Sequence, residues 1–193
     1  MTGFLPQGLL AVALLAGSLT FTSPASPAAP QATNRDAQTL ADFQTRVKNY
    51  LALRQKLLAG RPALPDKATP DQIDAYQRAL GDAIIAARKG ARKGDVFGAD
   101  MTVMARRLLG PIFKGPDGAA IRNAILEEAQ PLVPTINTRY PDDVPVSSMP
   151  PEILKALPKL EETLEFRFVG RHLILMDGPA HIIVDIVDNA MPS

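Results

Sequence analysis

Three short apolar runs near the C-terminal end, between Leu164 and Val187, form the strongest pattern in the chain. The stretch reads LEFRFVG-RHLILMD-GPA-HIIVDIV, three short runs that turn residues separate. Val, Ile, Leu and Phe dominate each run, and such residues suit a pleated, half-buried surface. The pattern predicts a three-stranded antiparallel meander that forms the core of the folded protein.

Strand register decides which side chains share a face of this meander. A tight turn at Gly170-Arg171 pairs Val169 with His172, and a second turn over 177–180 pairs Met176 with His181. One face then collects only apolar side chains: Leu164, Phe166, Phe168, Leu173, Leu175, Ile182, Val184 and Ile186. Burying each of them contributes roughly 1.5–3 kcal/mol, so this face is the expected core.

The opposite face carries the polar groups of the meander. In the favoured register His172 lies directly across from Asp185, and Arg167 and Glu165 share their face. A rival register has a three-residue loop over 179–181 with His181 in the left-handed conformation. It would place Asp185 on the apolar side, where an unpaired carboxylate is costly, and for that reason we favour the first register.

Helical periodicity marks the chain before the meander. Apolar residues at alternating spacings of three and four predict a helix from Asp36 to Ala59, preceded by a flexible lead-in over 29–35. The sequence Thr69-Pro70-Asp71-Gln72 is a typical helix start, with Thr as N-cap and Gln at the third position. That second helix should end within the doubled tetrapeptide 87–94, Ala-Arg-Lys-Gly repeated.

Two further helices and a proline-rich segment follow. Residues 95–109 predict a turn and a third helix that Gly110-Pro111 closes, and residues 119–129 a fourth with Asp117 as N-cap. Seven prolines between 131 and 158 exclude long helices and predict a stiff connector wrapped on the sheet. It leaves room for an edge strand over 135–138 and short helical turns over 150–157. The expected fold is α+β, with helices over 36–130 packing as one domain with residues 131–193.

The N-terminal segment resembles an export signal. Leu9 to Leu19 is an apolar run too short for a comfortable membrane anchor, and small residues precede Ala25 and Ala28. We expect a signal peptide over 1–28 with cleavage after one of these alanines, and hence a periplasmic or secreted protein. The first seven residues lack Lys and Arg, so an uncleaved anchor is the alternative.

Composition narrows the possible functions. The 21 basic and 20 acidic residues nearly cancel and aromatic residues make up 5%, which does not favour binding to nucleic acid. The chain has no cysteine, so it has neither disulfides, nor thiolate metal sites, nor a cysteine nucleophile. We expect no cofactor.

The candidate chemistry is limited to two small groups of residues. His172 opposite Asp185, with Arg167 and Glu165 beside them, would suit a pH-sensitive site, half a catalytic dyad, or part of a metal site with His181 or Asp177. The alternative is a cross-strand polar pair that only stabilises the sheet, and no full catalytic or metal set is present. The doubled tetrapeptide supplies the second group: Arg88, Lys89, Arg92 and Lys93.

These four basic residues would form a patch if their segment were helical. Such a patch suits weak contact with anionic lipid headgroups or with an acidic partner. The alternative is an ordinary helix C-terminus, where cations interact favourably with the helix dipole.

Roughly the C-terminal third to half of the chain, and only faintly the helices before it, resembles a group of exported bacterial proteins of unknown function. The resemblance rests on these residues: Tyr140-Pro141, Met149-Pro150-Pro151, Leu154, Leu157-Pro158, Leu160, Glu165 to Arg171, Leu175, Asp177 and Ile183 to Asp185. It implies a periplasmic or secreted location and no known activity. The sequence Arg167 to Gly170 followed by a hairpin is also similar in outline to the end of periplasmic RcnB-like proteins linked to nickel and cobalt homeostasis.

The absence of a catalytic set, together with amphipathic helices and a stiff connector, favours one function. We expect a non-catalytic module that binds another protein of the cell envelope. The alternative is a ligand- or metal-binding protein, with or without enzymatic activity, that uses the His172 and Asp185 face of the sheet.

Overall fold

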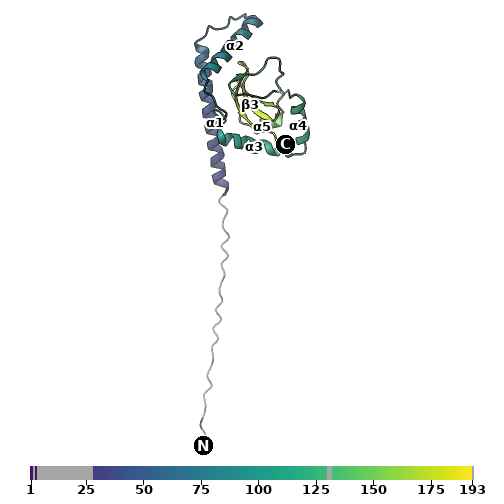
Figure 1. Cartoon of the computed structure of the whole chain (residues 1–193). Helices are drawn as coiled ribbons and strands as arrows, with labels where there is room; N and C mark the ends of the chain where they lie inside the picture. Colours follow the sequence, from purple (N-terminus) through teal and green to yellow (C-terminus); the bar gives the residue numbers. More distant parts are fainter. Residues whose placement is uncertain (2, 4–27, 130–131, 193) are drawn as a thin grey trace.

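A computed structural model describes residues 1, 3, 28–129 and 132–192 of the chain. The fold is α+β as expected, with helices first and an antiparallel sheet at the C-terminal end (Figure 1). The elements are α1 (Ala28–Ala59), α2 (Pro70–Ala87), α3 (Gly98–Lys114), α4 (Gly118–Glu127), β1 (Thr138–Arg139), α5 (Pro151–Ala156), β2 (Leu164–Val169), β3 (His172–Asp177) and β4 (Ile182–Val187). The expected signal peptide falls almost wholly outside the described residues.

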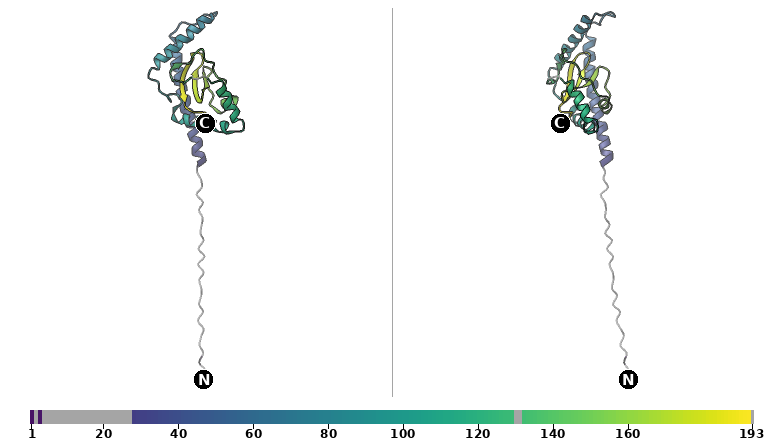
Figure 2. Two further views of the ribbon diagram at one scale, coloured as in Figure 1. Left: turned by 45° about the vertical axis from the view of Figure 1, so that its right-hand side comes forward. Right: turned by 90° about the vertical axis from the view of Figure 1, so that its right-hand side faces the viewer.

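The first two helices contact each other, and α2 crosses α1 at an oblique angle (Figure 1). The N-terminal turns of α1 project beyond the rest of the described fold (Figure 1, Figure 2). The flexible lead-in predicted over 29–35 is wrong, because α1 already begins at Ala28. Pro30 does not prevent this, since N–H groups in a first helical turn have no partner within the helix. At α2 the predicted capping box is present: Thr69 and Gln72 each accept the other's backbone N–H.

The third helix runs further than predicted. Gly110-Pro111 does not close it, and α3 continues to Lys114 with Pro111 inside. A proline inside a helix costs about 3 kcal/mol. The extra turn offsets that cost because it buries Phe113 completely, edge-on to Phe168 with ring centroids 5.9 Å apart. Asp117 occupies the N-cap position of α4 as expected, but its side chain makes no capping hydrogen bond.

The predicted meander is confirmed and gains a fourth strand. The strand order is β1-β4-β3-β2, and all neighbours are antiparallel. The first predicted turn is confirmed, because Val169 pairs with His172. The edge strand expected over 135–138 lies slightly later, at Thr138–Arg139, and pairs with Ile182 and Ile183 of β4.

The favoured register of the last strand is wrong. Asp185 lies opposite Leu175 rather than His172, and the ladder shifts by one residue between Leu175 and Met176. His181 has a φ of 52°, the left-handed conformation of the rival register. The shift is a β-bulge, which turns both Val184 and Asp185 toward the apolar face.

The sheet is covered on both faces. The helices cover one face with a large apolar core, in which Phe43, Phe97 and Phe166 stack in a row. The expected core face is confirmed except at its end, where the bulge puts Val187 in place of Ile186. The proline-rich connector covers the other face, as predicted, with Tyr140 and its neighbours over a smaller apolar cluster. None of the described helices is long and apolar enough to cross a membrane.

Candidate functional site

The predicted pair of His172 and Asp185 does not form. His172 lies beside Val169 at the start of β3, and its Nδ1 is 3.0 Å from Oδ1 of Asp188. Asp185 belongs to the opposite face of the sheet, fully buried under the helices. A dyad or metal site that combines the two residues is therefore contradicted by the geometry.

Asp185 instead holds together a loop and a strand. Its two carboxylate oxygens accept hydrogen bonds from the backbone N–H groups of Gly94, Val96, Phe97 and Ile186, all at 2.8 Å. Gly94 has a φ of 89°, a conformation that suits glycine and lets the loop wrap around the carboxylate. These four donors compensate the buried carboxylate, so its role is structural.

A second buried carboxylate ties α1 to the other end of the hairpin. Oδ2 of Asp177 accepts hydrogen bonds from Nε of Arg54 at 2.8 Å and from the hydroxyl of Tyr50 at 2.9 Å. Its other oxygen accepts the N–H of Ala180. Burial, and next the negative charge of Asp177, raise the pKa of Tyr50 far above its usual value. Tyr50 therefore stays protonated and acts as a fixed donor.

The remaining members of the predicted polar site pair with one another. Arg167 forms an ion pair with Glu165 along β2, and both side chains are half-buried. His181 lies 3.4 Å from Oδ1 of Asp142 in the connector, a separate location. Across the described part of the chain, no three His, Asp or Glu side chains come together as metal ligands would.

The predicted basic patch is dispersed. Its segment leaves the helix after Ala87, so the four cations do not share one helical face. Arg88 turns inward, where it lies over the ring of Tyr50 and donates to the carbonyl of Val184 at 3.1 Å. Lys93 pairs with Asp188. Of these four residues, Lys89 and Arg92 are exposed and form no ion pair with any described residue. Two separate cations weaken the case for a lipid-binding patch.

Asp188 joins several of these groups at the surface. The hydrogen bond from Lys93, at 2.5 Å, is the main reason why the pKa of Asp188 is lowered, and the contact with His172 adds to the effect. Arg106 of α3 donates two hydrogen bonds to the Asp188 carbonyl oxygen. The group is a small surface network that fastens the end of β4 to α3.

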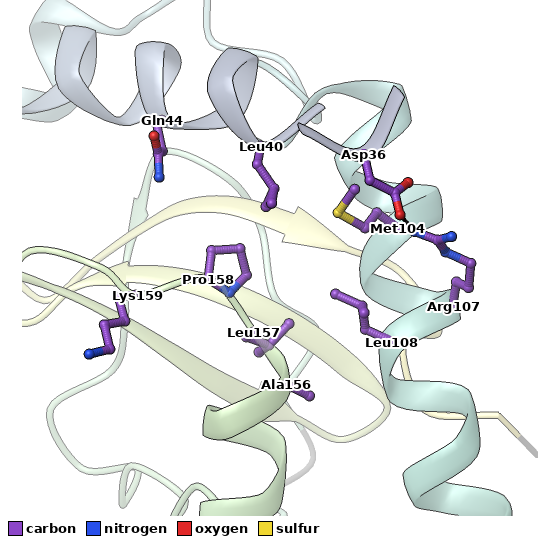
Figure 3. A pocket seen from close by; sticks show the side chains of 10 residues that line it. All are labelled: Asp36, Leu40, Gln44, Met104, Arg107, Leu108, Ala156, Leu157, Pro158 and Lys159. Atoms are coloured by element: carbon purple, nitrogen blue, oxygen red, sulfur yellow. Dashed lines mark hydrogen bonds and ion pairs between the residues drawn. The ribbon is translucent and has the colours of Figure 1, made fainter. Parts of the chain in front are cut away.

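A hollow of about 500 Å³ lies between α1, α3 and the segment that contains α5 (Figure 3). Leu40 and Gln44 of α1 point into it from one side, and Met104 and Leu108 of α3 line another. Ala156, Leu157 and Pro158 form its floor. The ion pair between Asp36 and Arg107 closes one end, and Lys159 lies at the other.

A second hollow of about 340 Å³ continues past Lys159 to the edge of the sheet. Its walls share Pro158 and Lys159 with the first hollow, so the two adjoin. The other lining residues come from α5, the following turn and β2: Leu154, Leu160, Leu164, Glu165, Phe166 and Arg167. We call the two hollows together the α5 groove.

The sequence contains only part of the signal for this groove. Asp36, Leu40 and Gln44 recur every four residues, which places them on one face of α1. Nothing in the sequence shows that this face meets Pro158 and Lys159, which lie more than a hundred residues later.

Comparison of the chain with family models, with curated proteins and with solved structures finds no match. The resemblance to exported bacterial proteins and to RcnB-like proteins therefore remains a prediction. A function for this chain rests on its own geometry.

Proposed function

We propose that this protein is a non-catalytic module of the cell envelope that binds another protein through the α5 groove. The observation that carries the proposal is the groove itself: two adjoining hollows with mainly apolar walls that end at an edge strand of the sheet. Exposed apolar surfaces rimmed by polar residues mark sites where another protein or a ligand binds.

The polar groups of the protein support the same interpretation. Both buried carboxylates accept several hydrogen bonds from the protein, so they hold elements together. The ligand- or metal-binding alternative loses its main support because His172 and Asp185 lie on opposite faces. Export through the N-terminal segment is part of the proposal and rests on the short apolar run Leu9 to Leu19 and the small residues after it.

Photo-crosslinking from inside the groove tests this proposal. A photoreactive amino acid at position 154, in the groove and exposed, should give an adduct with one partner protein in the envelope of living cells. The matched control is position 133, where Val133 is 82% exposed and lines neither hollow. Replacing Gln44 by Trp, which would fill the first hollow, should reduce the adduct.

The comparison between the two positions decides the outcome. Adducts of equal yield at 133 and 154 would indicate random collision and count against the groove. No adduct at 154 in cells that express the protein would reject the proposal.

A further inference from the structure

The outer edge of β2 has an open stretch beside the groove. β2 is an edge strand, with β3 on its inner side only. Backbone groups alternate in direction along an antiparallel strand, so those of Leu164, Phe166 and Phe168 share one side. They point outward, because the N–H of Leu164 bonds to Glu161 and the carbonyl of Phe168 accepts from the Ser147 hydroxyl, both outside the sheet.

Phe166 lies at the centre of this stretch. Its backbone N–H has no hydrogen-bond partner among the described residues, and its carbonyl accepts only a long contact of 3.4 Å from Arg167. Glu161 and Ser147 occupy the two ends of the edge. The open stretch is thus short, and it borders the second hollow, which Phe166 itself lines.

The charges in the groove do not cancel. Arg107 is neutralised by Asp36, and Arg167 by Glu165. Lys159, which lines both hollows, has no ion pair among the described residues. A positive charge therefore lies between two apolar hollows, and a complementary partner places a negative charge there.

We infer that the α5 groove binds an extended peptide segment of the partner, which adds a short strand to the outer edge of β2 at Phe166. An acidic side chain of this segment meets Lys159, and apolar side chains on either side enter the two hollows. This inference rests on the proposed function and specifies the chemistry of the partner. Strand addition of this kind combines main-chain hydrogen bonds with side-chain pockets.

An extended segment suits the site better than a helix does. A helix satisfies its own backbone groups and would leave the Phe166 N–H unpaired. Side chains on one face of a strand recur about every 6.8 Å, because the rise per residue is about 3.4 Å. A second copy of this chain, paired through its own β2, is the competing occupant, and it would make the molecular mass depend on concentration.

A set of five-residue peptides tests the inference directly. The protein purified from its cells is titrated with acetylated and amidated peptides. Each peptide carries Asp, Gln or Lys at its third position and Leu or Val at its first and fifth positions, which share one face of a strand. We expect the Asp peptides to bind roughly fivefold more tightly than the Gln peptides. The amide NMR signal of Phe166 should shift on binding, and its hydrogen exchange should slow.

Two controls separate the contributions of backbone and charge. N-methylation of the peptide backbone removes the donors that pair with β2, so methylated peptides should lose binding although their side chains are unchanged. Lys159→Glu should reverse the preference toward the Lys peptides. The matched control is Lys155→Glu, on α5 but outside both hollows. It should change neither the affinity for the peptides nor the preference for an acidic central residue.

The results also distinguish the inference from the proposed function. Binding that tolerates N-methylation, or that is indifferent to the central charge, overturns the inference. The same holds if no peptide of the set binds, or if the protein dimerises through β2. In each of these cases an adduct from position 154 would still support partner binding in the groove by another mode.

Discussion

The carboxylate of Asp185 lies in the apolar layer between the sheet and the helices, where four backbone N–H groups point at it. Three of these groups belong to the loop between α2 and α3, about ninety residues earlier in the chain. The side chain therefore fixes the loop that starts α3. The carboxylate is tolerated in the apolar layer because backbone N–H donors surround it.

Replacing this carboxylate should cost much of the stability of the protein. Asp185→Asn keeps the shape but brings an NH₂ donor among N–H donors, so the free energy of unfolding should fall by roughly 3 kcal/mol. Urea unfolding of the two proteins measures the difference. The matched control, Asp188→Asn at the surface, should cost less than about 1 kcal/mol. Equal losses of unfolding free energy in the two variants would show that the buried carboxylate of Asp185 contributes no more to stability than the surface carboxylate of Asp188.

The same residue explains why the sequence misled us about the last strand. An unpaired buried carboxylate is costly, so the sequence favours the register that keeps Asp185 off the apolar face. That judgement holds for an unpaired group, but the compensating donors are backbone N–H groups that no side-chain pattern reveals. The rival interpretation correctly gives His181 the left-handed conformation and places Asp185 on the apolar side. Its three-residue loop is wrong, because Asp177 pairs with Ile182, and the bulge keeps Ile182 and Val184 on the apolar face as the favoured register predicts.

At the scale of elements, the sequence predicts correctly those features that depend on residues close together in the chain. The capping box of α2 and the turn between β2 and β3 depend on residues within a few positions, and both are confirmed. The end of α3 depends instead on a distant partner, since Phe113 packs on Phe168. For the same reason the α5 groove was not predicted, because its walls meet only in the folded chain.

The proline inside α3 leads to a prediction at this scale. If tertiary packing holds the helix together through Pro111, then Pro111→Ala removes a local penalty and leaves the packing of Phe113 in place. The free energy of unfolding should rise by about 1–3 kcal/mol, with a higher melting temperature in calorimetry. A lower melting temperature would mean that the proline ring makes packing contacts that alanine cannot replace.

On the scale of the whole molecule, two buried polar contacts connect the helices to the sheet. Asp185 connects the α2–α3 loop to β4, and Asp177 connects α1 to the end of β3 through Arg54 and Tyr50. The apolar core between them is continuous over both halves of the chain, so helices and sheet share one core. The polar contacts fix how the two layers are oriented.

Breaking the contact between α1 and β3 tests this orientation. Arg54→Met leaves Asp177 buried without its cation and should lower the free energy of unfolding by about 3–5 kcal/mol. Adding Asp177→Asn to this variant should restore part of the loss. The control is Arg107→Met, which breaks the surface pair with Asp36 and should cost less than about 1 kcal/mol. Additive single effects in the double-mutant cycle would contradict direct coupling.

The distance along the chain between these partners affects the order of events during synthesis. The buried hydrogen bonds of Asp177 to α1 span 123 and 127 residues, and those of Asp185 to the α2–α3 loop span 88 to 91. A growing chain makes all the helices before it makes the meander on which they pack. Contacts of such length are slow to form, and the helices expose their apolar faces until the last strand is complete. Loss of the final fifteen residues would thus remove β4 and leave nascent helices as targets for chaperones and proteases.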